Sequence, residues 1–151
     1  MRTFWLTAHL VGMALWIGGG VATMVAGVVS KRLAPEPRLG AYRITSAVWR
    51  ILVGPGALVV VVSGVILAMP YMKSGVVPGS LGLMMMAGIV GALVALTVAL
   101  PAAAALGRLE IDPQGGLPPR FGALRMRLVW AASIAGGLAL TALIAAAVSR
   151  G

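Results

Sequence analysis

Four uninterrupted apolar blocks determine what this chain can fold into. They run over about 4–29, 49–69, 81–106 and 128–148, and none of them contains an Asp or Glu. Each block exceeds the roughly 20 residues that a helix needs to cross the hydrocarbon of a bilayer. Because the blocks show no alternation of polar and apolar residues, strands of a membrane barrel are excluded. The sequence predicts one all-α membrane domain over residues 1–151, a four-transmembrane-helix bundle.

The basic residues are divided unequally between the two ends of this predicted bundle. The chain has 12 Lys and Arg residues and a formal net charge of +9. Nine lie in the first and third connections, and three (Arg2, Lys73 and Arg150) lie on the other side. The positive-inside rule then places both termini outside a bacterial inner membrane. Since topology accounts for the basic charge, we expect the lipid bilayer, and not nucleic acid, as its partner.

Two basic segments resemble each other. Residues 38–43 read Arg-Leu-Gly-Ala-Tyr-Arg, and residues 120–125 read Arg-Phe-Gly-Ala-Leu-Arg. An Arg-Leu pair precedes each of them, at Arg32 and at Arg108. One interpretation is a tandem duplication of a two-helix hairpin, and the other is two basic loops of similar composition. In both cases the spacing indicates a short helical turn with its bases at lipid headgroups.

Small residues recur every four positions in three of the apolar blocks. This spacing lets helix backbones approach closely where no hydrophobic effect drives association. We therefore expect a tight bundle, with one stripe free to face other membrane subunits or a second copy. The stripes are Ala87, Gly91, Ala95, Ala99 and Ala103; Ser133, Gly137, Thr141, Ala145 and Ser149; and Gly19, Thr23 and Gly27. The second block contains Gly54-Pro55-Gly56, which predicts a kink.

His9 is a titratable group placed well inside an apolar block. The chain has one histidine and no cysteine, and its three carboxylates lie in the connections. An imidazole inside a membrane is a candidate functional group. The alternative is that a neutral histidine simply donates a hydrogen bond to a backbone carbonyl. No catalytic triad and no phosphate-binding loop can be assembled, so we expect no catalytic residue and no autonomous enzyme.

Methionines gather at the predicted depth of His9. Imidazole with thioether is a donor set for Cu(I), and His with Met is an axial pair for haem iron. The alternative is that methionine fills gaps in an apolar core. The candidate cofactor-binding residues are His9, which is also the candidate metal ligand, with Met13, Met69, Met84, Met85 and Met86; Arg2 and Lys73 are available for haem propionates.

Several short motifs of the chain also resemble those of a known family. His9-Leu10-Val11-Gly12, Trp16-Ile17-Gly18-Gly19, Gly54-Pro55-Gly56 with Ser63-Gly64, and Leu117-Pro118-Pro119-Arg120 look like the small bacterial integral-membrane family labelled domain of unknown function 2269. That resemblance covers all four blocks and implies a fold and a location but no activity. More loosely, the first block is similar to copper-resistance D-type proteins and to haem-dependent membrane protoporphyrinogen oxidases. In the latter, a first-span histidine ligates haem, and only His9 could correspond.

Three functional hypotheses follow. The first is an accessory or structural subunit of a membrane respiratory or redox complex, which binds no cofactor. The second is a b-type haem protein with His9 as axial ligand, and the third is a Cu(I)-handling protein that uses His9 and the outer methionines.

Overall fold

The computed structural model describes residues 1–75 and 78–148, and their regular structure is helical. The elements are α1 (Arg2–Val29), η1 (Ser30–Arg32), α2 (Pro35–Val48), η2 (Trp49–Val53), α3 (Gly54–Ser74), α4 (Gly79–Val94), η3 (Ala95–Ala99), α5 (Leu100–Gly107) and α6 (Phe121–Val148). They join into four helices that are long and apolar enough to cross a membrane. The predicted all-α four-helix membrane fold is confirmed.

The second membrane helix is much longer than its apolar block. It runs without a break over Pro35–Ser74, 40 residues, where the sequence predicted a start near Trp49. At 1.5 Å per residue it measures about 60 Å, roughly twice the hydrocarbon thickness of a bilayer. Its first part, α2, begins with Pro35 in the first turn, where a missing N–H costs nothing. Arg38, Arg43 and Arg50 therefore lie on a helix and not in a loop.

The second and the third membrane helix each contain a π-helical turn just before a proline. The turn η2 precedes Gly54-Pro55, and η3 precedes Leu100-Pro101. A proline has no N–H to donate to the preceding turn, and the extra residue of a π turn accommodates this loss. The irregularity predicted at Pro55 is thus a π turn. The two turns are neighbours in the bundle, because a Cβ added to Gly54 would lie 3.5 Å from Leu100.

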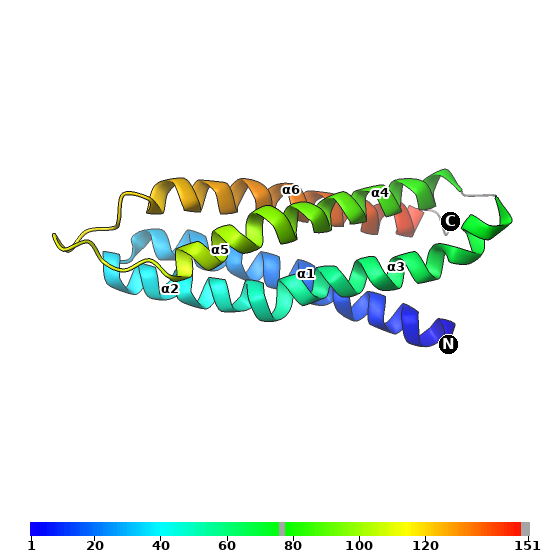
Figure 1. The fold of residues 1–151 in the computed structure, drawn as a ribbon, viewed down its shortest axis with the longest axis horizontal. Helices are drawn as coiled ribbons and strands as arrows, with labels where there is room; N and C mark the ends of the chain where they lie inside the picture. Colours follow the sequence, from blue (N-terminus) through cyan, green and yellow to red (C-terminus); the bar gives the residue numbers. More distant parts are fainter. Residues whose placement is uncertain (76–77, 149–151) are drawn as a thin grey trace.

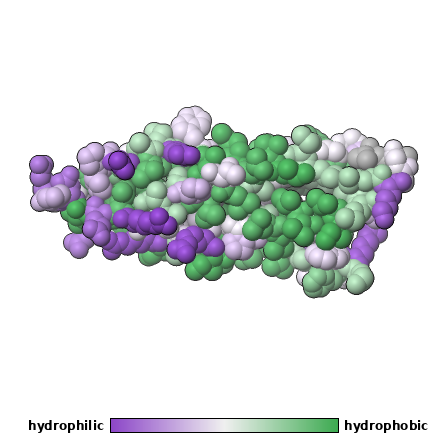
Figure 2. Space-filling model, viewed as in Figure 1, coloured by the Kyte–Doolittle hydropathy of each residue, from purple (hydrophilic) through white to green (hydrophobic). Residues whose placement is uncertain are grey.

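Figure 1 shows the helices side by side in an elongated bundle, with the N-terminus and the α3–α4 connection at one end. We call this the outer end, and the opposite end, which carries α2 and the α5–α6 connection, the basic end. Helix α1 packs on α3, α4 packs on α6, and α2 packs on α5. Figure 2 shows an apolar middle and hydrophilic residues gathered at the ends, most of them at the basic end. This pattern is typical of a multi-pass membrane protein.

The three predicted small-residue stripes differ in how far they are buried within the chain. In the third membrane helix the predicted stripe from Ala87 to Ala103 is buried throughout. In α6 the predicted stripe does not pack within the chain, since Ser133, Gly137 and Thr141 are exposed, so it is a stripe that is free to face another subunit. The buried stripe of α6 consists instead of Ala131, Ala135, Ala139 and Ala142. Ser149, like Arg150, lies outside the described residues. In α1, Gly19 is buried, and Thr23 and Gly27 are half-buried.

Helices α1 and α3 touch backbone to backbone. A Cβ added to Gly56 would lie 2.9 Å from the Gly12 carbonyl oxygen and 2.9 Å from the Trp16 nitrogen. A Cβ on Gly19 would lie 2.7 Å from Val53. Gly12 and Gly19 are seven residues apart, which returns them to one face of α1. This close seam holds the outer half of α1 against α3 and so determines where His9 points.

Candidate functional site

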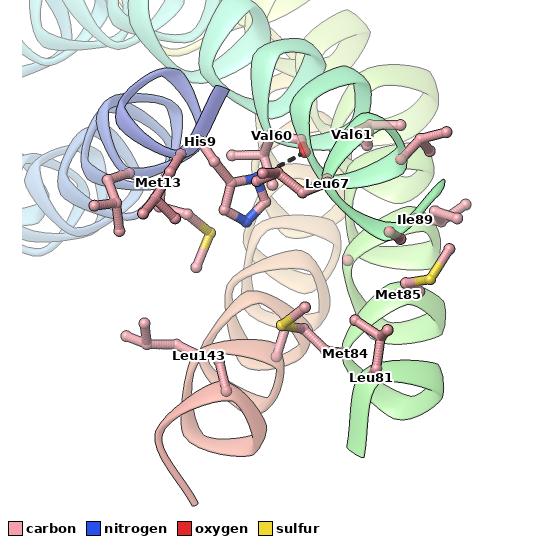
Figure 3. A pocket seen from close by; sticks show the side chains of 18 of the residues that line it. His9, Met13, Val60, Val61, Leu67, Leu81, Met84, Met85, Ile89 and Leu143 are labelled. Atoms are coloured by element: carbon pink, nitrogen blue, oxygen red, sulfur yellow. Dashed lines mark hydrogen bonds between the residues drawn. The ribbon is translucent and has the colours of Figure 1, made fainter. Parts of the chain in front are cut away.

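His9 points into the bundle and bonds to α3. Its Nδ1 lies 3.1 Å from the Val60 carbonyl oxygen and 3.0 Å from the Ser63 Oγ. The Val60 carbonyl can only accept, so we assign the proton to Nδ1. The Ser63 hydroxyl then accepts from Nδ1 and donates to the Val59 carbonyl. Among the residues that the structure describes, Nε2 has no hydrogen-bond partner and is left as an acceptor, and Figure 3 shows it facing a cavity.

Gly64 makes room for the imidazole. A Cβ added at Gly64 would lie 3.2 Å from the His9 Cε1, closer than ordinary van der Waals contact. Any larger residue would press on the ring. Together, Val60, Ser63 and Gly64 form a seat on α3 that fixes both the position and the tautomer of His9.

The cavity that the His9 Nε2 faces has a volume of about 460 Å³ and is lined by all four membrane helices. That volume lies within the range of small-molecule and cofactor sites. Its lining is mostly aliphatic, and polar groups are concentrated at the outer mouth, where Arg2, Tyr71 and Ser80 lie. An apolar chamber with one imidazole inside and one cation at its mouth suits a ligand with an apolar body and an anionic edge.

Trp16 closes the cavity toward the middle of the bundle. It is 2% exposed, and it lies two turns deeper on α1 than His9. Its ring reaches α4, since a Cβ added to Gly91 would lie 3.3 Å from it. Trp16 is therefore a core residue that also forms the floor of the cavity.

The cavity also opens sideways. Leu10 on α1 and Leu143 on α6 line it and yet are 57% and 45% exposed. Large apolar side chains that face both a cavity and the protein surface mark a lateral opening. In a bilayer this opening meets lipid chains, so an apolar ligand can reach the cavity without passing through water.

The structure separates the methionines that the sequence grouped together. Met13, Met84 and Met85 line the cavity with His9. Figure 3 shows Met84 across the cavity from His9, with Met85 further away beside Ile89. Met86 and Met69 are 63% and 46% exposed and do not line it. Successive helical residues are 100° apart, so Met84, Met85 and Met86 cannot all face one space.

Only one of the two candidate cations lies at the cavity. Arg2 lines the mouth of the cavity, whereas Lys73, in the last turn of α3, is exposed and lies outside the lining. Of these two residues, Arg2 is therefore the one that can meet an anionic group of a ligand bound in the cavity beside His9.

Sequence reasoning missed the partners of His9. Ser63 is fully buried and Val60 contributes its backbone, so neither has a distinctive pattern. The available signal was Ser63 itself, a hydroxyl in the middle of an aliphatic block, followed by glycine. No cluster of three or more His, Cys, Asp or Glu occurs within residues 1–75 and 78–148. A metal here would therefore need thioether or cofactor ligands besides His9.

The fold and the cavity define a multi-pass membrane protein with a chamber at one end of a four-helix bundle. No protein-family model, curated protein or solved structure matches the chain.

Proposed function

We propose that this is a bacterial inner-membrane protein that binds a b-type haem in the outer cavity, with His9 as an axial ligand. The observation that carries the proposal is the seat of His9 on α3. Metal-bound histidines commonly donate their second ring N–H to a carbonyl, which orients the ring and raises its basicity. The bond from His9 Nδ1 to Val60 supplies that arrangement and directs Nε2 into the cavity.

The other lining residues suit the same group. Met84, across the cavity, has a thioether that could serve as a second ligand to the haem iron, and Arg2 at the mouth could pair with a propionate. The aliphatic walls suit the macrocycle, and the lateral opening at Leu10 and Leu143 leaves space for its edge. A haem bound here would supply one-electron chemistry, and the protein would tune it through the His9 hydrogen bonds and the burial.

The test is an absorption spectrum and a pyridine-haemochrome assay on protein purified from its native membrane. We expect a Soret band that is lost in His9→Ala and shifted in Met84→Leu. Met86→Leu is the matched control, because Met86 is only two residues from Met84 and does not line the cavity. A parent protein without a Soret band after haem supplementation would rule out the proposal.

Cu(I) binding is the second candidate, and the thioethers favour it. Met13, Met84 and Met85 share the cavity with the free Nε2 of His9, and soft donors with imidazole select Cu(I). Metal analysis of the same preparation distinguishes the two proposals. Copper that is present in the parent and in Met86→Leu, and absent from His9→Ala, would favour it over haem.

An accessory subunit without a cofactor is the competing proposal. The exposed stripe of Ser133, Gly137 and Thr141 on α6 supports it, because small residues on a lipid-facing surface suit another helix. The partner would be another membrane subunit or a second copy of this chain. If His9→Ala leaves the spectrum, the metal content and the co-purifying proteins unchanged, this proposal replaces the other two.

The proposed orientation, with both termini outside, places the His9 cavity at the outer face. The concentration of Lys and Arg at the basic end supports it. The chain contains no cysteine, so single cysteines at Lys73 and Arg108 would report on opposite sides. Labelling of intact cells by an impermeant maleimide should modify the first and spare the second.

A further inference from the structure

The two similar basic segments meet in space. Residues 38–43 lie on α2, and residues 120–125 open α6. Tyr42 and Phe121, one from each segment, are both buried, and their rings stand edge to face with centroids 5.1 Å apart. This aromatic pair joins the two segments at the basic end.

Two arginines are held by this pair, one from each segment. The Cζ of Arg38 lies 5.0 Å from the centre of the Phe121 ring, which is cation–π geometry. The Arg125 Nε donates to the Tyr42 hydroxyl at 3.0 Å. Arg38 and Tyr42 are four residues apart on α2, and Phe121 and Arg125 are four apart on α6. Each arginine therefore lies on the same face of its helix as its neighbouring aromatic ring.

Neither guanidinium group has a carboxylate partner among the residues that the structure describes. No Asp or Glu oxygen comes within 4.0 Å of a Lys or Arg nitrogen in residues 1–75 and 78–148. The Nε of Arg38 is buried and has no hydrogen-bond partner there. Burying such a donor unpaired is costly, and a charged one more so. Two ordered, half-buried cations without an anion indicate that an anion is supplied from outside the chain.

The depth of the pair identifies the source of that anion. A Cβ added to Gly27 would lie 3.9 Å from the Tyr42 hydroxyl, so the pair is level with the last turn of α1. Lys31 and Arg32 follow directly, in η1. This is where the apolar surface of α1 ends, and lipid headgroups are expected at that level.

We propose that Arg38 and Arg125 form a binding site for the phosphate of an anionic phospholipid headgroup. The planar guanidinium fork suits phosphate oxygens, and stacking on Phe121 and the bond to Tyr42 orient the forks in advance. The lipid chains would lie along the apolar surface of the bundle.

The chain provides matched controls within the same two segments. Arg43 occupies the position in its segment that Arg125 occupies in the other, and Arg120 likewise corresponds to Arg38. Both are exposed, and neither stacks on a ring or makes a side-chain hydrogen bond to another described residue. Loss of either removes the same charge from the same end without touching the site.

The experiment titrates the detergent-solubilised full chain with phosphatidylglycerol, phosphatidylcholine or inorganic phosphate, and counts bound lipid by native mass spectrometry. We expect phosphatidylglycerol to bind in preference to phosphatidylcholine. Arg38→Gln and Arg125→Gln should each weaken it by about tenfold, the scale of one charge-assisted hydrogen bond. Arg43→Gln and Arg120→Gln should change it by less than about twofold, as expected for an exposed charge.

Equal losses in all four variants would reduce the effect to net charge and overturn the site. Equally tight binding of inorganic phosphate would assign the site to a soluble anion and would contradict the proposal of a lipid site. If a Gln variant fails to fold, as judged by thermal unfolding, Arg38→Lys decides. It keeps the charge but loses the planar fork, so we expect most of the tenfold loss, and parent-like binding would contradict the proposal.

Discussion

Gly12 of α1 and Gly56 of α3 lie with their backbones in direct contact. A Cβ added to Gly12 would lie 3.0 Å from the Gly56 carbonyl oxygen, and one added to Gly56 would lie 2.9 Å from the Gly12 carbonyl oxygen. Gly12 is one turn from His9, and Gly56 is one turn from Val60, which accepts the His9 hydrogen bond. The separation of these two backbones therefore determines whether the imidazole reaches α3.

Gly56→Ala should force α1 and α3 apart. We expect a loss of about 1–3 kcal/mol in the free energy of unfolding, the usual cost of overpacking. Thermal unfolding in detergent measures it. Gly136→Ala on α6 is the control, because a Cβ there meets nothing within 4 Å. Equal stability of the two variants would contradict the close seam.

The three consecutive glycines at 18–20 should respond unequally to alanine. A Cβ on Gly19 would lie 2.7 Å from Val53, whereas those on Gly18 and Gly20 would meet nothing within 4 Å. Gly19→Ala should cost about 1–3 kcal/mol of unfolding free energy. Gly18→Ala and Gly20→Ala should be neutral or stabilise by up to about 1 kcal/mol through helix propensity. Chemical denaturation in mixed micelles ranks the three, and a uniform response would contradict the packing of α1.

His9 should carry its proton on Nδ1. Since the chain has one histidine, nitrogen-15 NMR of histidine-labelled protein needs no assignment. We expect a protonated Nδ1 and an unprotonated Nε2. Ser63→Ala should retain this tautomer, because the Val60 carbonyl still accepts, and should cost about 1 kcal/mol of stability. A protonated Nε2 in the ligand-free parent would show that Nδ1 is not the donor to Val60.

Gly91→Leu and Gly137→Leu should fail in different ways. A Cβ on Gly91 would lie 3.1 Å from Leu138 and 3.3 Å from Trp16, so leucine there should disrupt the bundle itself. A Cβ on Gly137 meets nothing within 4 Å, so the isolated chain should tolerate leucine. If the α6 stripe binds another subunit, Gly137→Leu should lose that partner in native gels while keeping the parent's unfolding temperature. Unfolding of Gly137→Leu would place the stripe inside the bundle.

Much of the fold could be predicted because long apolar blocks leave a helix no alternative in lipid. The face of α6 that packs into the bundle could not be predicted. Ala131, Ala135, Ser133 and Gly137 are all small, and no polar face marks which side is outside. The extension of the second helix to Pro35 was hidden by the mixed composition of α2, whose buried residues include the polar Thr45 and Ser46 beside Leu39 and Tyr42. Whether the chain arose by duplication stays a prediction.

The sequence predicted the central residue of the candidate site, but it could not predict which other residues line the cavity. His9 stands out because a lone imidazole in an aliphatic helix is rare. Met13 and Met84 share its cavity, but depth alone could not separate them from Met69 and Met86, which face outward. The direction in which each side chain points depends on how each helix is rotated, and the seam at Gly12 and Gly56 determines that for α1 and α3.

The Trp16 floor has a consequence for ligand exchange. Arg2 and Trp16 are 14 residues apart on α1, about 21 Å along its axis, which is roughly the depth of one leaflet with its headgroups. In a bilayer crossed by the four helices, the chamber would extend over a single leaflet. A hydrophobic ligand dissolved in the opposite leaflet would have to flip across the bilayer before it could bind. The abundance of the ligand in one monolayer, and not in the whole membrane, would set the occupancy of His9.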